Sequence, residues 1–420
     1  MGEQLRFFLN RLRQRLWIKP LLFCLLSIAA ALLAQLADTV PISANLERLI
    51  PDVNQDSIED LLKISAASML VIATFSVSSM VAAYASAGNT ATPRAFSLVI
   101  ADDVSQNALS TFIGVFIYSI VALVALMNGV YEKSGRFLLI SLTLISLTVV
   151  IVTFVRWVDK IARLGRLGNV IDKVEAATAN AMRDRQAFPN LRGVPATLSA
   201  EHATAVYAET VGYVQWIDTG KLQSCACEYN LRILVAALPG TFATPDRPIA
   251  YVLPDDLSAD ITDTAHIGQS FVIGQDRLFD HDPRFGLVVL SEIASRALSP
   301  AVNDPGTAID IIGTLVRLFV HWSASRELEQ TPECDRVFVP DLSVADMFDD
   351  AFTAIARDGA GFLEVQVRLQ KALQTLAARD NDAMRLAARR HTRSALARAE
   401  QTITFEPDLQ LIRGAAKITD

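Results

Sequence analysis

The sequence predicts a membrane α-helical bundle of four transmembrane helices joined to a cytoplasmic α+β domain with a helical C-terminal part. Three observations predict this fold class: four long apolar segments before residue 160, basic residues on both sides of that region, and mixed strand and helix patterns after it. Hydrophobic residues make up 51% of the 420 positions. The expected organisation is a transmembrane domain over 1–160, a stalk helix and linker over 161–190, a mixed α/β subdomain over 191–282, a helical subdomain over 283–400 and a tail over 401–420.

Each of the four apolar segments approaches the length needed to cross a membrane, which is about 20 residues of helix. The segments are Leu21–Ala37, Leu61–Ala87, Ala108–Asn128 and Phe137–Trp157, and none carries a charged residue near its middle. The first segment has an alternative interpretation as a cleaved signal peptide, because Ala34-Gln-Leu-Ala37 is a tolerable cleavage site. We favour a membrane span, because the basic leader is long and three further spans follow.

The distribution of Lys and Arg predicts the orientation of the spans, because short basic loops stay in the cytoplasm. Basic residues precede the first span and end the fourth: Arg6, Arg11, Arg13, Arg15 and Lys19, then Arg156, Lys160, Arg163 and Arg166. The loop after the first span is mostly acidic. Together with the even number of spans, this pattern predicts a cytoplasmic N-terminus and a cytoplasmic C-terminal domain.

A stripe of small residues runs along the second span. Its hydroxyl members recur at steps that return to one helix face: Ser65, Ser68, Ser76, Ser79 and Ser86, with Ile72 and Ala83 between them. Small and hydroxyl side chains allow close helix packing in lipid, and the same face could instead line a hydrated pore. We favour packing, because small residues are common at membrane helix interfaces, and the pore stays open as an alternative.

A surface helix is expected over 92–106, between the second and third spans. Thr92 followed by Pro93 is a typical helix start. An apolar turn then leads to Asp102, Asp103 and Gln106, so the segment is amphipathic and feeds directly into the third span. We interpret the two aspartates as a solvated helix face. They could also form an ion-attracting mouth or a docking point for the soluble domain.

Strand-like and helix-like patterns alternate over 191–282. We expect a helix at Ala200–Thr210, a strand at Gly212–Asp218, a helix through Cys225 and Cys227, a β-run at Leu231–Leu238, a turn at Pro239-Gly240 and a strand at Ile249–Leu253. The region around the turn loosely resembles biotinyl and lipoyl carrier barrels. No lysine stands at a modification position, so the resemblance implies only a small barrel-like unit without a cofactor.

Helical periodicity dominates the rest of the chain. One helix is expected at Pro283–Leu298, and another runs from Pro305 to about Trp322 with Asp304 as its cap. Two or three more helices are expected over 343–400. The apolar stretch 306–320 is too short for a fifth span, and Asp310 and Arg317 interrupt it.

Four polar residues around the break at 298–304 form the main candidate site of the cytoplasmic domain. Glu292 and Arg296 are spaced i,i+4, and Asn303 and Asp304 follow shortly. Such a cluster could bind a ligand or gate a cavity. We favour a structural interpretation, in which an ion pair steadies the helix and Asn and Asp cap a tight corner.

Other sequence signals weigh against catalysis and metal binding. Asp276, Asp280, His281 and Asp282, with His266 nearby, lack the histidine spacing of a metal site and are typical of an Asp-rich turn. Cys225 and Cys227 point to different faces of the predicted helix. The sequence has no phosphate loop and no nucleophile elbow. We therefore expect no catalytic residues, metal or cofactor, and the net charge of −7 argues against nucleic-acid binding.

Three motifs together resemble a known family. They are Thr92-Pro-Arg94, Gly212-Tyr-Val-Gln-Trp-Ile-Asp218 and Arg296-Ala-Leu-Ser-Pro-Ala-Val-Asn-Asp-Pro-Gly-Thr-Ala308. The chain resembles, from about residue 10 to about residue 400, the bacterial predicted membrane proteins catalogued as domain of unknown function 2254. The resemblance implies an inner-membrane protein and brings no established activity. Gly306 departs from the family pattern, where a larger residue is expected.

Two functions fit these observations. The first is an oligomeric channel or transport-like protein, in which several copies assemble in the lipid bilayer around an ion or small-ligand path and the cytoplasmic domain forms a vestibule. The second is a membrane-anchored sensor or scaffold whose cytoplasmic domain binds a small ligand or a protein. The absence of buried carboxylates argues against proton-coupled transport, which normally needs ionisable residues within the spans.

Overall fold

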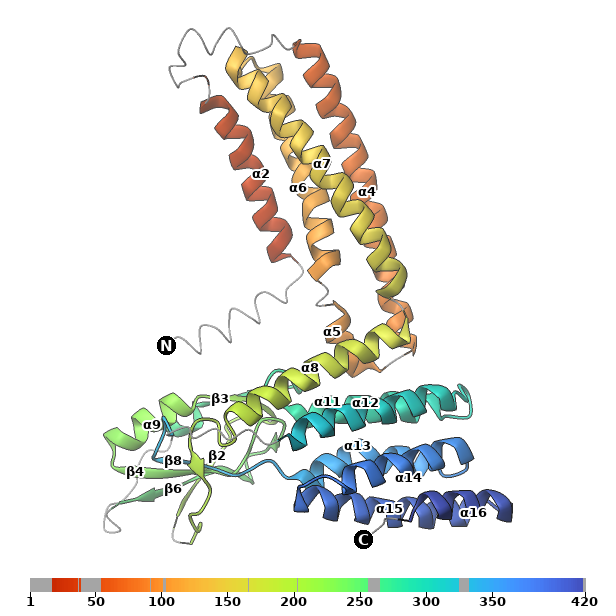
Figure 1. The fold of residues 1–420 in the computed structure, drawn as a ribbon. Helices are drawn as coiled ribbons and strands as arrows, with labels where there is room; N and C mark the ends of the chain where they lie inside the picture. The colour runs from red at the N-terminus through yellow and green to blue at the C-terminus, as the bar shows by residue number, and fades with distance from the viewer. Residues whose placement is uncertain are drawn as a thin grey trace. The chain divides into compact units, whose positions relative to one another are not determined.

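The structure is a computed structural model that divides into two compact units, Met1–Val170 and Ile171–Asp420 (Figure 1). It describes residues 17–36, 38, 54–90, 92–100, 103–164, 166–201, 203–255, 265–324 and 332–417. Asp102 lies outside the described residues, and so does the side chain of Asp103.

Four long helices make up most of the N-terminal unit. They are α2 (Ile18–Leu36), α4 (Gln55–Thr90), α6 (Asp103–Met127) and α7 (Lys133–Leu164). Each is long and apolar enough to cross a membrane, as the sequence predicted, and the described residues contain four such helices. The helix α12 (Pro305–Ser323) in the C-terminal unit is not among them, in agreement with the argument against a fifth span.

The helix α6 lies at the centre of the N-terminal unit, in contact with α2, α4 and α7. Half of the apolar span of α6 is buried, whereas a third or less is buried in the spans of α2, α4 and α7. Two apolar clusters fill the interior, one around Leu62 and Leu126 and the other around Phe112 and Trp157. The outward faces of α2, α4 and α7 expose apolar side chains such as Leu25, Val71 and Ile151, as expected for helices whose solvent is lipid.

The expected surface helix over 92–106 is not continuous. A 3₁₀ turn at Pro93–Ala95 and the short helix α5 (Phe96–Ile100) are followed by α6, which begins at Asp103. Thr92 does occupy the cap position, but its side chain makes no capping hydrogen bond. Gln106 folds back instead and donates from Nε2 to the carbonyl of Ile100 at 3.1 Å. This bond satisfies a carbonyl at the end of α5 that lacks a helical partner.

The C-terminal unit contains two open sheets, where the sequence had suggested one barrel-like unit. The larger sheet has the order β1-β8-β4-β6-β2, and the smaller has the order β5-β3-β7. The strands are β1 (Val194–Pro195), β2 (Thr204–Tyr207), β3 (Gly212–Ile217), β4 (Leu231–Val235), β5 (Phe242–Ala243), β6 (Pro248–Pro254), β7 (Phe271–Gly274) and β8 (Val337–Val339). The helices α9 (Thr219–Glu228) and α10 (Ala265–Gly268) accompany them.

Two features of these sheets differ from the expectations. The segment Ala200–Thr210 forms β2 rather than a helix, because Thr204–Tyr207 pairs antiparallel with β6. The strand β8 comes from between two helices far along the chain and pairs parallel with both β1 and β4. The turn at Pro239-Gly240 is present, and Gly240 adopts a positive φ of 91° that glycine tolerates best.

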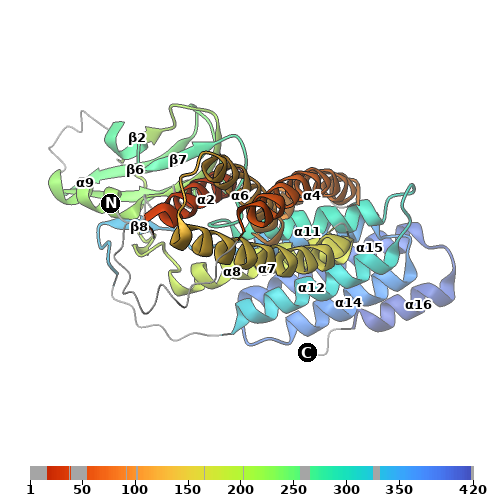
Figure 2. The ribbon, with the colours of Figure 1, turned by 90° about the horizontal axis from the view of Figure 1, so that it is seen from above.

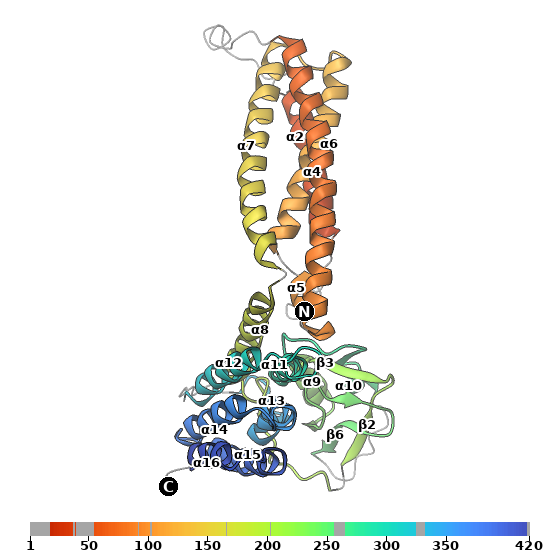
Figure 3. The ribbon, with the colours of Figure 1, turned by 90° about the vertical axis from the view of Figure 1, so that its right-hand side faces the viewer.

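Helices form the other end of the C-terminal unit (Figure 2). They are α8 (Leu167–Ala187, mostly within this unit), α11 (Pro283–Ala297), α12 (Pro305–Ser323), α13 (Val344–Asp358), α14 (Leu363–Ala377), α15 (Asp382–Thr402) and α16 (Glu406–Ala415). They stack in layers: α11 and α12, then α13 and α14, then α15 and α16 (Figure 3). The expected tail over 401–420 therefore contains a helix, α16, whose Leu409 and Ile412 are buried.

Candidate functional site

The serine stripe of α4 is divided between the interior and the surface of the N-terminal unit. Ser65 and Ser76 are 3% and 0% exposed, Ser68 and Ser79 are half-buried, and Ser86 is exposed. The buried face of α4 continues through Leu62, Met69 and Ala73 and packs against α6 and α7 of the same chain. Small side chains at 65 and 76 thus lie where α4 meets its neighbours.

The expected polar mouth at the start of α6 is described only at Gln106. This residue is 2% exposed, so it does not lie on a solvated helix face. Its Nε2 is bonded to Ile100, and its Oε1 has no hydrogen-bond partner among the described residues. Gln106 is therefore part of the packed start of α6.

The motif at 296–308 forms a corner between α11 and α12. Asp304 donates its N–H to the carbonyl of Ala297 at 2.8 Å, and Asn303 donates to Ser299 at 2.8 Å. Asn303 has a φ of 52°, in the left-handed region that Asn tolerates better than most residues. Asp304 caps α12 through the Thr307 N–H and hydroxyl, and these bonds hold its pKa below the usual range.

The other two members of this motif lie on α11. Glu292 is half-buried and Arg296 is exposed, and both make interactions with other residues. Asn303 and Asp304 therefore shape the turn between the two helices, whereas the ion pair expected between Glu292 and Arg296 stays a prediction.

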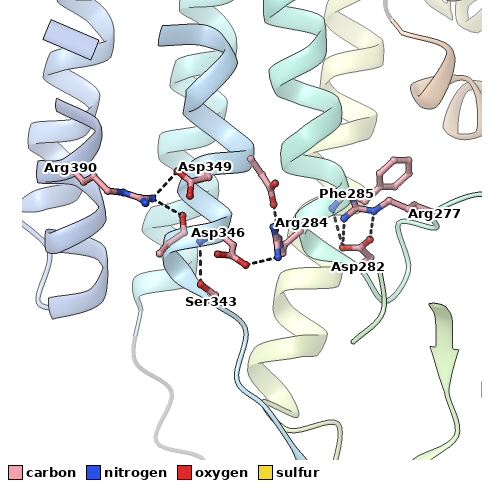
Figure 4. Close-up of polar contacts among 10 residues, drawn as sticks. Arg277, Asp282, Arg284, Phe285, Ser343, Asp346, Asp349 and Arg390 are labelled. Carbon is pink, nitrogen blue, oxygen red and sulfur yellow. Dashed lines mark hydrogen bonds and ion pairs between the residues drawn. The ribbon is translucent and has the colours of Figure 1, made fainter. Parts of the chain in front are cut away.

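A network of ion pairs that sequence reasoning missed connects α11 to α13 (Figure 4). Arg284 donates from Nε to Asp350 at 2.6 Å and from Nη1 to Asp346 at 2.8 Å. Burial alone would lower the pKa of Arg284, but the hydrogen bond to Asp350 and the charges of both carboxylates raise it overall. The pairs span more than 60 sequence positions, so spacing along the chain gave no signal for them.

The helix α13 is also bonded to α15. Asp349 accepts hydrogen bonds from Arg390 at 2.7 Å and pairs with Nε2 of His391 at 3.0 Å. His391 is buried, with its ring centroid 5.9 Å from that of Phe348 and 6.2 Å from that of Phe352. Burial lowers the pKa of His391, although the charge of Asp349 opposes the shift.

Asp282 connects the helices to the β-turn at 239–241. Its carboxylate is 3% exposed, accepts the Phe285 N–H at 3.1 Å and pairs with Arg277 at 2.7 and 3.0 Å. Gly240 packs against it so closely that a Cβ there would overlap the carboxylate. Burial raises the pKa of Asp282, against the effect of Arg277. Asp282-Pro283 is the same helix-start signal as Asp304-Pro305, so the sequence did contain a clue to this role.

The helix α8 is attached to three different parts of the C-terminal unit. Glu175 pairs with Arg317 of α12, Thr178 packs against Gly286 of α11, and Arg185 donates to the carbonyl of Pro340 after β8. Gln186 completes the attachment by donating to carbonyls at the end of α12. Since α8 follows α7 directly in the chain, it joins this unit to the last membrane helix.

The described residues form ion pairs and helix caps at the positions above. No three His, Cys, Asp or Glu side chains among them gather to hold a metal ion. Cys24, Cys225, Cys227 and Cys334 form no disulfide with one another, and burial raises the pKa of Cys225. The ion pairs join helices of the C-terminal unit to one another.

Four candidate spans followed by an α+β unit define a multi-span membrane protein with a large C-terminal domain. The chain belongs to the family described as "Predicted membrane protein (DUF2254)", whose model matches residues 13–375. This match confirms the family resemblance found in the motifs.

Uncharacterised mycobacterial proteins are among the relatives of this chain. It is 28% identical over 273 residues to "Uncharacterized protein Rv1290c" of Mycobacterium tuberculosis and to "Uncharacterized protein Mb1321c" of Mycobacterium bovis. The matched region covers 61% of this chain and 49% of each relative, so the chain spans about half the length of these relatives. No solved structure matches the chain.

Proposed function

We propose that the protein is a membrane-anchored sensor in the bacterial inner membrane, with both termini in the cytoplasm. Its C-terminal unit binds a small ligand and passes the resulting change to the membrane helices. The observation that carries this proposal is the attachment of α8. The helix follows α7 in the chain and is bonded to α11, α12 and the loop after β8, so a rearrangement of these elements must move or release it.

The buried hydroxyls of α4 support this choice over a pore between copies of the chain. A pore of that kind needs the stripe on an outer surface, where several chains could meet around an axis. Ser65 and Ser76 instead lie in the interior of a single chain's bundle. The positive charges before the first span and after the fourth support the cytoplasmic orientation.

A ligand screen on the full-length protein in lipid nanodiscs tests the sensor proposal. A ligand that binds only the folded state stabilises it by about 2.7 kcal/mol at a concentration of 100 times Kd. We expect at least one nucleotide or metabolite to raise the unfolding temperature and to change hydrogen–deuterium exchange in α8. If ligands raise the unfolding temperature but leave α8 unchanged, binding does not reach the membrane helices. If no ligand raises it, the sensor proposal is wrong.

A channel is the second candidate, favoured by one observation inside the bundle. The hydroxyls of Ser76 and Ser119 are fully buried and have no hydrogen-bond partner among the described residues. Water inside the bundle would satisfy both groups. Planar-bilayer recording of the purified protein tests this function: a conductance that Ser76→Leu abolishes would support it. No conductance, or one that this substitution leaves unaltered, would exclude a path along Ser76.

A further inference from the structure

The attachments of α8 differ in kind between its two halves. In the C-terminal half, Arg185 is 5% exposed and donates from Nη2 to Pro340 at 3.2 Å. Gln186 donates from Nε2 to the carbonyls of Trp322 at 2.8 Å and His321 at 3.3 Å. Burial lowers the pKa of Arg185 to about 10, so it keeps its charge at neutral pH. Pulling this half away would take these donors from the carbonyls of Pro340, Trp322 and His321, and a carbonyl left without a partner is costly.

The middle of α8 crosses α11 at a glycine. Thr178 is 1% exposed, and its hydroxyl donates to the carbonyl of Val174 at 2.6 Å, within the same helix. It faces Gly286, where even a Cβ would overlap the Thr178 side chain. The two helix backbones therefore approach closely at one point, and no polar bond between Thr178 and Gly286 fixes the angle at which they cross.

The N-terminal half buries Ile171 and Val174, much as the C-terminal half buries Ala181 and Met182, and its polar attachment to α12 is an ion pair near the surface. Arg317 donates from Nε and Nη2 to the two carboxylate oxygens of Glu175, at 2.7 and 2.6 Å. The side chain of Arg317 is nevertheless 60% exposed. The hydrogen bond and charge of Glu175 raise the pKa of Arg317, and Asp172 and Asp310 add to the effect. Three carboxylates thus act on one exposed guanidinium. A pair of this kind is weakened by salt and contributes only about 0–1 kcal/mol.

We infer that α8 is a strap with one fixed end and one releasable end. Its C-terminal half stays attached to the C-terminal unit. The contact between Thr178 and Gly286 is the pivot about which the N-terminal half moves. The Glu175–Arg317 ion pair is the latch, which can break and form again. The releasable half is the one that leads along the chain to α7. The role of this latch in signalling rests on the sensor proposal, in which ligand binding changes the balance between the paired and the separated state of Glu175 and Arg317.

Hydrogen–deuterium exchange of the full-length protein in nanodiscs, without any ligand, tests the strap. Arg317→Gln removes the latch, and Arg368→Gln is the matched control, because it removes an exposed arginine that approaches Gly313, one turn before Arg317 on α12. We expect Arg317→Gln to speed exchange over 171–177 by up to about fivefold, the factor given by the upper value for an exposed ion pair. Exchange over 181–187 is expected to stay unchanged, and the control is expected to change neither segment.

Two outcomes would overturn the strap. One is equal acceleration along the whole of α8 in Arg317→Gln, which would make the helix a single rigid attachment. The other is no acceleration in either half, which would mean that the ion pair holds nothing. High salt provides a second measurement on the wild type, since it is expected to speed exchange over 171–177 there and to have little further effect in Arg317→Gln. Because no ligand is used, the result is independent of the screen that tests the sensor.

Discussion

The two units give contrasting examples of how polar side chains find partners. In the N-terminal unit, hydroxyls bond to carbonyls one turn back in their own helix, as with Thr74 to Leu70, Ser110 to Gln106 and Thr143 to Leu139. In the C-terminal unit, charged side chains bond across elements, as Arg284 does to Asp350 and Asp346.

The solvent explains this difference. A bilayer offers no water to a polar group that loses its partner, so bonds within one helix are the safe solution and apolar packing joins the helices. In water, a broken ion pair is solvated again at modest cost, so ion pairs between elements can form and open. Polar contacts that switch are therefore expected in the C-terminal unit.

The largest expected effect comes from the buried Arg277–Asp282 pair at the start of α11. Asp282→Ala removes the cap of α11 and leaves Arg277 without its carboxylate, so we expect a loss of about 3–5 kcal/mol in unfolding free energy. Asp304→Ala removes a cap that is more exposed and is expected to cost about 1 kcal/mol. Denaturant unfolding of both variants in detergent measures the difference. Equal losses would contradict the role assigned to burial at Asp282.

The next effect tests apolar packing in the N-terminal unit. Ser76→Leu forces extra methylenes between α4 and its neighbours, so we expect a loss of about 1–3 kcal/mol. Ser78→Leu is the matched control, because Ser78 is exposed on the same helix and bonds only to Thr74. Thermal unfolding in nanodiscs compares the two variants. If both behave like the wild type, position 76 is not in a packed interior.

A pH effect is expected from His391 on α15. Its pKa in the folded state lies below the unfolded value of 6.5 because the ring is buried. As the pH falls below 6.5, the unfolded chain therefore binds a proton that the folded chain does not, and stability declines until the folded-state pKa is reached. His391→Gln is expected to show a smaller loss of unfolding temperature between pH 7.5 and pH 5.5. An identical loss in both proteins would show that His391 does not contribute.

The smallest effect concerns the latch on α8. Arg317→Gln is expected to change the unfolding free energy by about 1 kcal/mol or less, since the pair it breaks is exposed. A loss as large as that of Asp282→Ala would mean that Glu175–Arg317 is part of the core of the unit. Denaturant unfolding beside Arg368→Gln provides the comparison.

Sequence reasoning succeeded for this protein where one local rule was sufficient. The spans follow from length and apolar content, and the start of α12 follows from Asp304-Pro305. It failed where the partner lies far away in the chain. β8 has three residues and pairs with β1 across more than 140 positions, and β2 became a strand because β6 lies beside it.

The candidate site shows the same limit. Helical periodicity put Ser65 and Ser76 on one face of α4, but it contained no information on whether that face meets α6, a second copy or water. The bonds of Arg284 to Asp346 and Asp350 depend on the packing of α13 beside α11. No spacing rule could have brought these residues together.

The sequence alone determined the number of membrane spans, the family and the cap of α12, because each depends on neighbouring residues and on the solvent. Only the tertiary structure decided the two sheets, the ion pairs on α13 and the attachments of α8. These features join residues that are distant in the chain. Their interactions contribute to stability only after folding has brought the paired groups within bonding distance.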